Sequence, residues 1–389
     1  METIRVNRKA AGRVDAGHPW IFRSDVLDTV DAKLGGETVQ VVSGSRTLGV
    51  AHYSSTSLIA LRLLSKRVEE TDAAFFRRRL RSAAEFRTQV VSGTDAFRLV
   101  YAEADGLPAL IVDRYADVLV LQALNQGMDR ATPLIVRALE ELFQPAGILA
   151  RNDAAVRSLE DLPRETKVLA GSIPETVAFE MNGLRLRADL QHGMKTGGFL
   201  DQRENYLAAA KYARGAALDC FTSTGGFALT LAKTCERVEG VDSSELAIQH
   251  ARQSAEANGI SNIAFTEGDV FEALAGYSAA RRSFDTIVLD PPAFAKSRDH
   301  IDSAARAYKE INRRALSLLR SGGVLVTCSC SHHMSEAHLL GVIAEAALET
   351  RRNLRVLERR TQAADHPVLL TAPETHYLKC IILQETDYC

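Results

Sequence analysis

The sequence lacks the features that would place the chain in a membrane or outside the cell. No apolar run approaches the ~18 residues that a membrane-spanning helix needs. Charged Glu2 and Arg5 stand where a signal peptide would need an apolar core, so secretion is not expected. Six cysteines among 389 residues are too few for a disulfide scaffold, and free thiols are expected instead. These absences predict a cytoplasmic protein with no membrane partner.

The composition is that of a globular protein, with 46% hydrophobic and 25% charged residues. A chain of 389 residues is too long for one ordinary core, so two or three domains are expected. The net charge of −2 conceals an asymmetry, because residues 1–90 hold 15 Lys and Arg against 10 Asp and Glu. A basic front end is compatible with a nucleic acid held through its phosphates. The arginines at 77–81 are explained equally well by contacts with nucleic acid and by the solvated face of a helix.

The spacing of apolar residues predicts three regions. Residues 1–70 read as short strands at 38–42, 48–53 and 58–64, which is typical of a small β-barrel. Asp72 is the expected N-cap of a helix that runs to about residue 90. Strands at 97–101, 110–114, 118–122 and 147–150, with a helix at 130–142, predict a β-rich α+β middle domain that ends near Ile173.

Beyond residue 215 strands and helices alternate, which predicts an α/β domain with a doubly wound parallel sheet. The expected strands are 217–220, 237–241, 263–266, 286–289 and 323–327, with later candidates at 354–358 and 378–383. The predicted domains are therefore 1–70, 71–175 and 176–389.

A nucleotide-like ligand is predicted at the ends of the first three strands of this sheet. Gly225 and Gly226 follow the first strand, where they allow a ligand to approach the backbone at a helix N-terminus. Asp242 ends the second strand, where a carboxylate can accept both hydroxyls of a ribose. Asp269 follows the third strand and could accept an adenine amino group. A purely structural role for these residues is the weaker interpretation.

The same turn lacks the full glycine pattern of a dinucleotide site, and bulky Phe221 lies within it. Both features disfavour a pyrophosphate and favour S-adenosyl-L-methionine. An oxidoreductase is therefore the weaker class of enzyme.

Asp290 and Cys330 carry the predicted chemistry. Asp-Pro-Pro follows the fourth strand, and the fifth strand leads into Cys330. Cytosine C5 is a poor nucleophile, but a thiolate that adds to C6 makes C5 able to attack a methyl group. Asp290 is a candidate proton acceptor or base contact. Cys328 lies deeper in its strand and is expected in the core, as are Cys220, Cys235 and Cys380; a metal site formed by Cys328, Cys330, His332 and His333 lacks suitable spacing.

Several motifs occur together along nearly the whole chain. They are Gly-His-Pro-Trp at 17–20, Asp-Gly-Leu-Pro at 105–108, Lys-Thr-Gly-Gly-Phe-Leu-Asp-Gln-Arg at 195–203, Asp-Pro-Pro-Ala-Phe at 290–294, Ser-Cys-Ser at 329–331 and Asp-His-Pro at 365–367. With them the chain resembles the large-subunit ribosomal RNA cytosine-5 methyltransferases, the large-subunit methyltransferase I group. The resemblance implies an N-terminal PUA-type RNA-binding barrel, a small middle domain and a C-terminal Rossmann-like class I methyltransferase domain.

The resemblance also implies which residues act. Cys330 matches the nucleophile of the family, and the stretch from 195 to 203 is expected against the cofactor. The predicted catalytic residues are Cys330 and Asp290. The predicted cofactor contacts are Lys195, Thr196, Phe199, Asp201, Arg203, Asp219, Phe221, Thr224, Gly225, Gly226, Asp242, Ser243, Asp269, Val270, Asp290 and Pro291.

The predicted function is formation of 5-methylcytosine in large-subunit (23S) ribosomal RNA, with ribosomal RNA as the partner; the sequence leaves a homodimer open. One departure is Ala293, which stands where many RNA cytosine-5 methyltransferases have a second cysteine. Asp-Pro-Pro-Ala-Phe also resembles loops of enzymes that methylate a base nitrogen, so nitrogen methylation of guanine or adenine is the first alternative. A non-catalytic RNA-binding assembly factor is the second, and the acids beside Cys330 argue against it.

Overall fold

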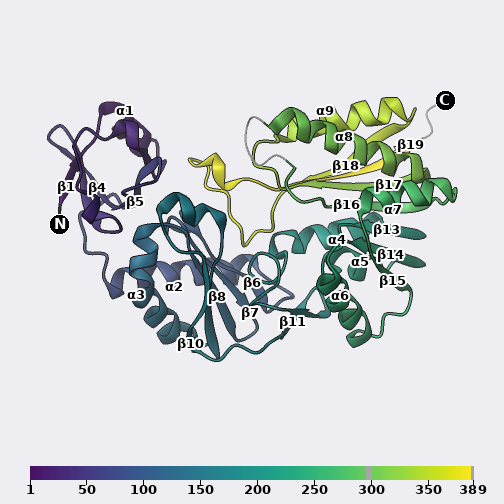
Figure 1. Cartoon of the computed structure of the whole chain (residues 1–389), viewed down its shortest axis with the longest axis horizontal. Coiled ribbons are helices and arrows are strands. Elements are labelled where there is room, and N and C mark those ends of the chain that lie inside the picture. The colour runs from purple at the N-terminus through teal and green to yellow at the C-terminus, as the bar shows by residue number, and fades with distance from the viewer. Residues whose placement is uncertain (295–299, 387–389) are drawn as a thin grey trace. The chain divides into compact units, whose positions relative to one another are not determined.

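The computed structural model describes residues 1–294 and 300–386. The chain forms two compact units (Figure 1). The first contains residues 1–177, 189–197 and 364–375, and the second contains residues 178–188, 198–363 and 376–389. Within the described ranges, no helix combines the length and the apolar character that crossing a membrane would require.

The first unit begins with a five-stranded sheet in the order β1-β3-β4-β5-β2. Its strands are β1 (Thr3–Arg5), β2 (Trp20–Phe22), β3 (Thr38–Ser43), β4 (Arg46–Tyr53) and β5 (Ile59–Ser65). Helix α1 (Arg8–Asp15) begins where the Asn7 side chain accepts a hydrogen bond from the amide of Ala10. Ile4, Val41 and Leu61 belong to a separate apolar cluster inside this sheet. The three strands expected here are present, whereas α1, β1 and β2 were not predicted.

The first unit continues with a sheet in the order β10-β9-β8-β7-β6. The elements are α2 (Ala73–Val90), β6 (Ala96–Tyr101), β7 (Leu110–Tyr115), β8 (Val118–Ala123), α3 (Gln126–Phe143), β9 (Gly147–Asn152) and β10 (Glu165–Gly171). The carboxylate of Asp72 accepts a hydrogen bond from the amide of Phe75, which confirms the predicted N-cap of α2. Strands β8 and β9 are parallel because α3 connects them, and the other pairs are antiparallel. Short 3₁₀ helices lie at Arg23–Asp25, Ala32–Leu34, Ala102–Asp105, Ala155–Glu160 and Pro373–Thr375.

The second unit is built on a seven-stranded sheet in the order β15-β14-β13-β16-β17-β19-β18. Its strands are β13 (Ala216–Cys220), β14 (Arg237–Asp242), β15 (Ile263–Glu267), β16 (Phe284–Leu289), β17 (Leu319–Ser329), β18 (Asn353–Arg360) and β19 (Lys379–Thr386). The helices are α4 (Arg203–Tyr212), α5 (Gly226–Leu231), α6 (Glu245–Ala257), α7 (Val270–Ala279), α8 (Ile301–Leu318) and α9 (Glu336–Glu349), and a 3₁₀ turn covers Leu200–Gln202. A separate hairpin pairs β11 (Val177–Met181) with β12 (Leu184–Ala188).

The predicted strands of this sheet are present, but the sheet is not wholly parallel. Strand β19 runs antiparallel to both β17 and β18, and it lies between them. A parallel strand would need a connection that brings the chain back to the end of the sheet where β18 begins. In the described residues between β18 and β19 no α-helix makes such a connection, and β19 runs back along β18. The apolar pattern at 378–383 therefore predicted a strand correctly but could not predict its direction.

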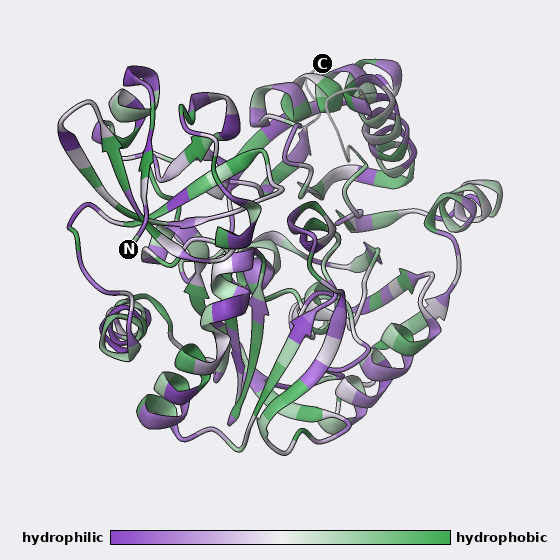
Figure 2. Ribbon diagram, turned by 60° about the vertical axis from the view of Figure 1, so that its left-hand side comes forward, coloured by the Kyte–Doolittle hydropathy of each residue, from purple (hydrophilic) through white to green (hydrophobic). Residues whose placement is uncertain are grey.

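Apolar side chains on both faces of the sheet form the core of the second unit. Leu218, Ile287 and Leu325 are buried in neighbouring strands, and Tyr308 and Ile343 pack against them from α8 and α9. In Figure 2 the helices carry hydrophobic and hydrophilic residues in turn along their length, as expected where one helical face covers a sheet. This packing fixes the strand ends, and the predicted site residues follow those ends.

Candidate active site

Four neighbouring parallel strands end at one edge of the large sheet. Cys220 at the end of β13 is in register with Val241 of β14 and with Leu289 of β16, and Leu289 is in register with Thr327 of β17. Because parallel strands share a direction, the residues that follow their carboxyl ends meet at this edge. The turn after β13, Asp242, Asp290 and the approach to Cys330 are therefore neighbours. The sheet brings together the four sequence positions on which the prediction depends.

Asp219 holds the turn after β13. Its Oδ2 accepts hydrogen bonds from Thr222 Oγ1 at 2.6 Å and from the Ala228 amide at 2.9 Å. Its Oδ1 is buried and has no hydrogen-bond partner within the described part of the chain. Burial raises the pKa of Asp219 to about 7, the Thr222 hydrogen bond opposes this rise, and the negative charges of Asp290 and Asp242 add to it. A buried oxygen that lacks a partner is suited to a cationic or hydrogen-bond-donating ligand group.

The turn itself needs unusual backbone conformations. Gly225 has a φ of +86°, and a Cβ there would come 3.2 Å from atoms of Leu229 and Phe265. Phe221 and Ser223 also have positive φ values, 63° and 49°. Strain of this kind is tolerated where the surrounding structure enforces it, and it is common at ligand sites. The predicted Thr224 lies half-buried in the same turn, ahead of Gly226 at the start of α5.

Asp242 connects the turn after β13 with the turn after β14. Its Oδ2 accepts a hydrogen bond from the Ser223 amide at 2.8 Å, and its Oδ1 accepts one from the Ser244 amide at 2.9 Å. Each carboxylate oxygen has a second lone pair, so the side chain can still accept hydrogen bonds from a ribose. Ser243 is exposed beside it. Cofactor binding by Asp242 and Ser243 stays a prediction.

Asp269 has a structural role that the sequence analysis did not assign. Its Oδ1 accepts a hydrogen bond from the Glu272 amide at 3.0 Å and so caps α7. The residue is exposed, while Val270 beside it is buried. The second carboxylate oxygen is compatible with an adenine contact, which stays a prediction.

Tyr206 of α4 lies within electrostatic range of three carboxylates of the second unit. Burial raises the pKa of Tyr206 well above its usual value, and the charges of Asp290, Asp201 and Asp219 raise it further. The Tyr206 hydroxyl donates to the Phe199 carbonyl at 3.3 Å. Asp201 in turn accepts a 2.5 Å hydrogen bond from the Tyr377 hydroxyl. The predicted Phe199 and Asp201 therefore join the group around Asp219 and Asp290, and Tyr206 and Tyr377 are members that the sequence analysis missed.

The other predicted residues of this stretch divide between the units. Arg203 is buried at the start of α4 in the second unit. Lys195 and Thr196 belong to the first unit. The Thr196 hydroxyl donates to Asp113 Oδ2 at 2.6 Å, and Asp113 also accepts two hydrogen bonds from Arg98. Cofactor contacts by Lys195, Thr196 and Arg203 stay predictions.

Cys330 lies beside the loop that follows β16. Its Sγ is 4.0 Å from the carbonyl oxygen of Pro291, and the residue is half-buried. Cys328, two residues earlier, is fully buried and stands opposite Cys380 in the β17–β19 register. Cys220, Cys235 and Cys380 are also buried, as predicted. Cys330 differs from these four in its partial exposure, which reactive thiols require.

A hydrogen-bonded group next to Cys330 was not predicted. Ser329 Oγ donates to the Tyr308 hydroxyl at 2.9 Å, and the Tyr308 and Ser331 hydroxyls are 3.1 Å apart. The Lys379 ammonium donates to the Ser331 carbonyl at 2.7 Å. Lysine within the apolar run at 378–383 was the available signal, because a strand interior rarely holds a cation without a reason.

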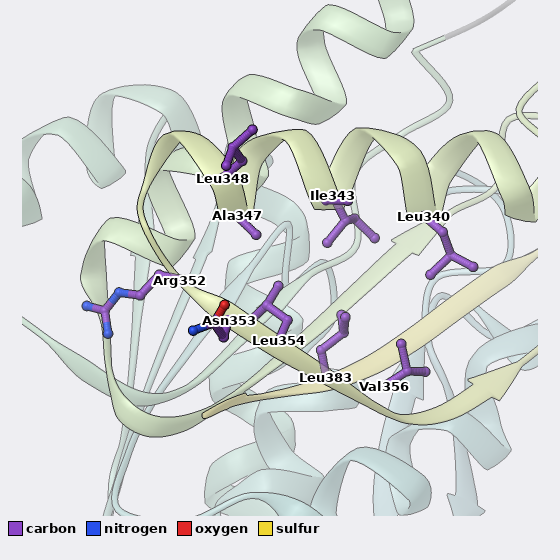
Figure 3. Close-up of a pocket in the computed structure, with 10 residues that line it drawn as sticks. Leu340, Ile343, Ala347, Leu348, Arg352, Asn353, Leu354, Val356 and Leu383 are labelled. Atoms are coloured by element: carbon purple, nitrogen blue, oxygen red, sulfur yellow. The ribbon is translucent and has the colours of Figure 1, made fainter. Parts of the chain in front are cut away.

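A mostly apolar pocket of the second unit lies apart from the predicted site residues. It is lined by residues of α9, β18 and β19, including Leu340, Ile343, Leu354 and Leu383, and measures about 330 Å³ (Figure 3). It contains none of the predicted site residues. Across residues 1–294 and 300–386, no group of three His, Cys, Asp or Glu side chains is placed to hold a metal ion.

Comparisons with known proteins agree with this geometry. A methyltransferase-domain model matches residues 213–366, and a PUA-like domain model matches residues 4–66. The ribosomal RNA large subunit methyltransferase I of Aeromonas salmonicida is 41% identical over 376 residues, covering 94% of this chain and 95% of that protein. The protein of that name from Shewanella amazonensis is 40% identical over 391 residues, covering 98% and 99%.

Solved structures share the fold. A methyltransferase complexed with SAH has a TM-score of 0.86 and 20% identity, and the match covers 99% of this chain and 100% of that chain. A SAM-dependent methyltransferase from Streptococcus mutans has a TM-score of 0.83 at 20% identity, with the same coverage.

The fold and the site define a methyltransferase with a Rossmann-like domain and a PUA-like domain, as the sequence predicted. At 41% identity over nearly the full length of its relatives, the chain belongs to the ribosomal RNA large subunit methyltransferase I family. The predicted cofactor, S-adenosyl-L-methionine, is confirmed with the family and its methyltransferase domain. The residues present fit it, because the partnerless Oδ1 of Asp219 and the carboxylate of Asp242 offer the acceptors that it needs.

Proposed function

We propose that the protein methylates C5 of a cytosine in large-subunit (23S) ribosomal RNA through a covalent bond between Cys330 and C6. The observation that carries this proposal is the half-buried Cys330 thiol, 4.0 Å from the Pro291 carbonyl in the loop that begins with Asp290. A thiol at that place is required for C5 chemistry and has no task in methylation of a base nitrogen. The relatives at 40–41% identity carry ribosomal RNA in their names, which supports the choice of substrate.

The side chains supply the steps of nucleophilic catalysis. S-adenosyl-L-methionine, when bound, supplies an electrophilic methyl group. The Cys330 thiolate donates an electron pair to C6, and the C5–C6 π electrons become available at C5 for attack on that methyl. The proton on C5 then leaves, the C5–C6 double bond re-forms, and the thiolate departs. Asp290 begins the loop that contacts Cys330, and in this proposal it contacts the base or accepts a proton released in the reaction.

The other parts of the chain have supporting roles in this proposal. The PUA-like region within residues 1–70 holds RNA, in keeping with its excess of basic side chains. Residues 71–175 form the middle domain, and residues 176–389 hold the methyltransferase. The reaction takes place in the cytoplasm, where ribosomal RNA is found. Nitrogen methylation is the second candidate, because Asp-Pro-Pro-Ala-Phe at 290–294 also resembles the loops of such enzymes.

Nucleoside mass spectrometry tests the proposal directly. Purified protein is incubated with large-subunit ribosomal RNA and S-adenosyl-L-methionine labelled in its methyl group, and the RNA is digested to nucleosides. We expect the label in 5-methylcytidine. RNA that carries 5-fluorocytosine at the target should form a covalent adduct, because fluorine cannot leave as a proton does. Label on a guanine or adenine nitrogen, without an adduct, would establish the second candidate instead.

A further inference from the structure

Lys379 is a buried cation at the end of β19 nearest to Cys330. Only 4% of the residue is exposed, and it stands opposite Ser329, the residue before Cys330, in the antiparallel register. Burial of an ammonium group is costly unless nearby groups compensate its charge. The position of Lys379 therefore needs an explanation beyond strand packing.

The hydrogen bonds of Lys379 do not neutralise its charge. Its Nζ donates to the Ser331 carbonyl at 2.7 Å and to the Tyr377 carbonyl at 2.8 Å. Both acceptors are neutral, and in the described ranges no carboxylate forms an ion pair with Lys379. An ammonium has three donors, so one N–H remains beyond these two bonds. Lys379 thus keeps an uncompensated positive charge next to the nucleophile.

The charge of Lys379 and that of Cys330 act on each other. Burial lowers the pKa of Lys379 to about 8, and the negative charge of Cys330 raises it against that effect. Coupling of this kind is reciprocal, so the ammonium must favour the thiolate as the thiolate favours the ammonium. With a pKa of about 8, Lys379 is still mostly protonated at neutral pH.

Other ionisable groups around Cys330 act in the opposite direction. Burial raises the pKa of Tyr308 to about 12, and both Cys330 and Asp290 contribute to that rise. Both groups act on Tyr308, so the negative charge of Asp290 is expected to disfavour a second negative charge at Cys330. Cys328, on the same strand, has a pKa raised well above its usual value by burial and by Cys380. His332 and His333 follow Cys330 in the chain. A nearby cation opposes the effect of these negative charges and favours the thiolate.

We propose that Lys379 is the positioning residue that stabilises the thiolate of Cys330 and fixes the end of its strand through the Ser331 carbonyl. This inference rests on the proposed function for its use in catalysis. The thiol releases its proton to solvent, and no bond of Lys379 changes. The sulfur electron pair forms the bond to C6, and the same thiolate is regenerated when that bond breaks. Lys379 thereby supports both the attack and the departure of the nucleophile.

A matched pair of variants separates charge from geometry. In Lys379→Gln a side chain with two N–H donors is kept, although it is one atom shorter, and the charge is lost. In Lys379→Arg the charge is kept. The rate of Cys330 alkylation by iodoacetamide is measured against pH by peptide mass spectrometry, which distinguishes Cys330 from the other cysteines. We expect Lys379→Gln to raise the pH at which alkylation reaches half its maximal rate by about one unit, with about tenfold slower alkylation at pH 7. Lys379→Arg should keep most of the parent's pH profile.

An unchanged alkylation profile in Lys379→Gln would overturn the proposal. Equal profiles for the Gln and Arg variants that both differ from the parent would also overturn it, because the charge would then have no effect of its own. If Lys379→Gln does not fold, as judged by circular dichroism, Lys379→Met provides a second neutral side chain for the same measurement. The alkylation readout does not depend on methyl transfer. A shifted profile in a protein that methylates a base nitrogen would refute the proposed function while leaving the action of Lys379 on Cys330 intact.

Discussion

The sulfur of Cys330 lies 4.0 Å from the carbonyl oxygen of Pro291, although 39 residues separate them in the chain. The contact exists because β16 and β17 are adjacent and parallel, so that the segments after both strands meet at one edge of the sheet. The thiol and the Asp-Pro-Pro loop therefore lie at the same strand ends, which supports the proposed covalent mechanism.

Replacement of the nucleophile should abolish turnover without affecting the fold. We expect Cys330→Ala to bind S-adenosyl-L-methionine as the parent does and to lose methyl transfer almost completely, because no other group makes C5 nucleophilic. Cys328→Ala is the control: it is fully buried, so it should lower the free energy of unfolding by on the order of 1 kcal/mol and retain turnover. Methyl transfer to ribosomal RNA by each variant is the measurement. Substantial activity in Cys330→Ala would mean that the thiol is structural.

Asp242 should be required for cofactor affinity. Asp242→Ala removes charge-assisted hydrogen bonds, each worth about 1.5–3 kcal/mol, so affinity should fall at least tenfold. The same change frees the amides of Ser223 and Ser244, so the melting temperature is followed in parallel. Isothermal titration with S-adenosyl-L-methionine is the measurement. A folded variant with unchanged affinity would show that the carboxylate serves only the turn.

The buried Asp219 should make stability depend on pH in a defined window. Its pKa is raised from 3.8 to about 7, so the native protein binds this proton more tightly than the unfolded chain. The contribution of Asp219 to the free energy of unfolding is therefore fully present below pH 3.8. It is lost as the pH rises to 7, by at most about 1.4 kcal/mol per pH unit. Asp219→Asn should become more stable relative to the parent between pH 5 and pH 7. Urea unfolding at both values measures this difference, and a constant difference would refute the raised pKa.

Gly226 should tolerate no side chain. A Cβ at this position would collide with the ring of Tyr206, so Gly226→Ala should lower the free energy of unfolding by about 1–3 kcal/mol. Gly276 in α7 is the matched control, because a Cβ there has no atom within 4 Å. Gly276→Ala should stabilise the protein by about 0.5–1 kcal/mol through helix propensity. Equal effects of the two substitutions in denaturant unfolding would contradict the packing described around Tyr206.

Local patterns predicted much of this fold and less of the site. Asp72 was recognised as a cap because an acid before an amphipathic helix satisfies free amides, and the structure confirms it. The direction of β19 could not be predicted, since its pairing with β17 and β18 depends on residues distant in sequence. Tyr206 was missed for the same reason, whereas Lys379 carried a local signal, a lysine within an apolar run, whose meaning depends on the strand that pairs with it. Asp269 was predicted as a ligand contact, and the structure shows that it caps α7. An acid between a strand and a helix has the same sequence pattern in both roles.

The insertion of β19 between β17 and β18 has a consequence for synthesis on the ribosome. Among the residues that the structure describes, strand β18 pairs with the sheet only through β19, and β19 is translated after both of its neighbours. Until β19 emerges, β17 presents an open edge and β18 has no strand to join in this sheet. Open edges of this kind promote pairing with other chains. We therefore expect an aggregation-prone interval during synthesis, which ends when β19 closes the sheet and places Lys379 opposite Ser329.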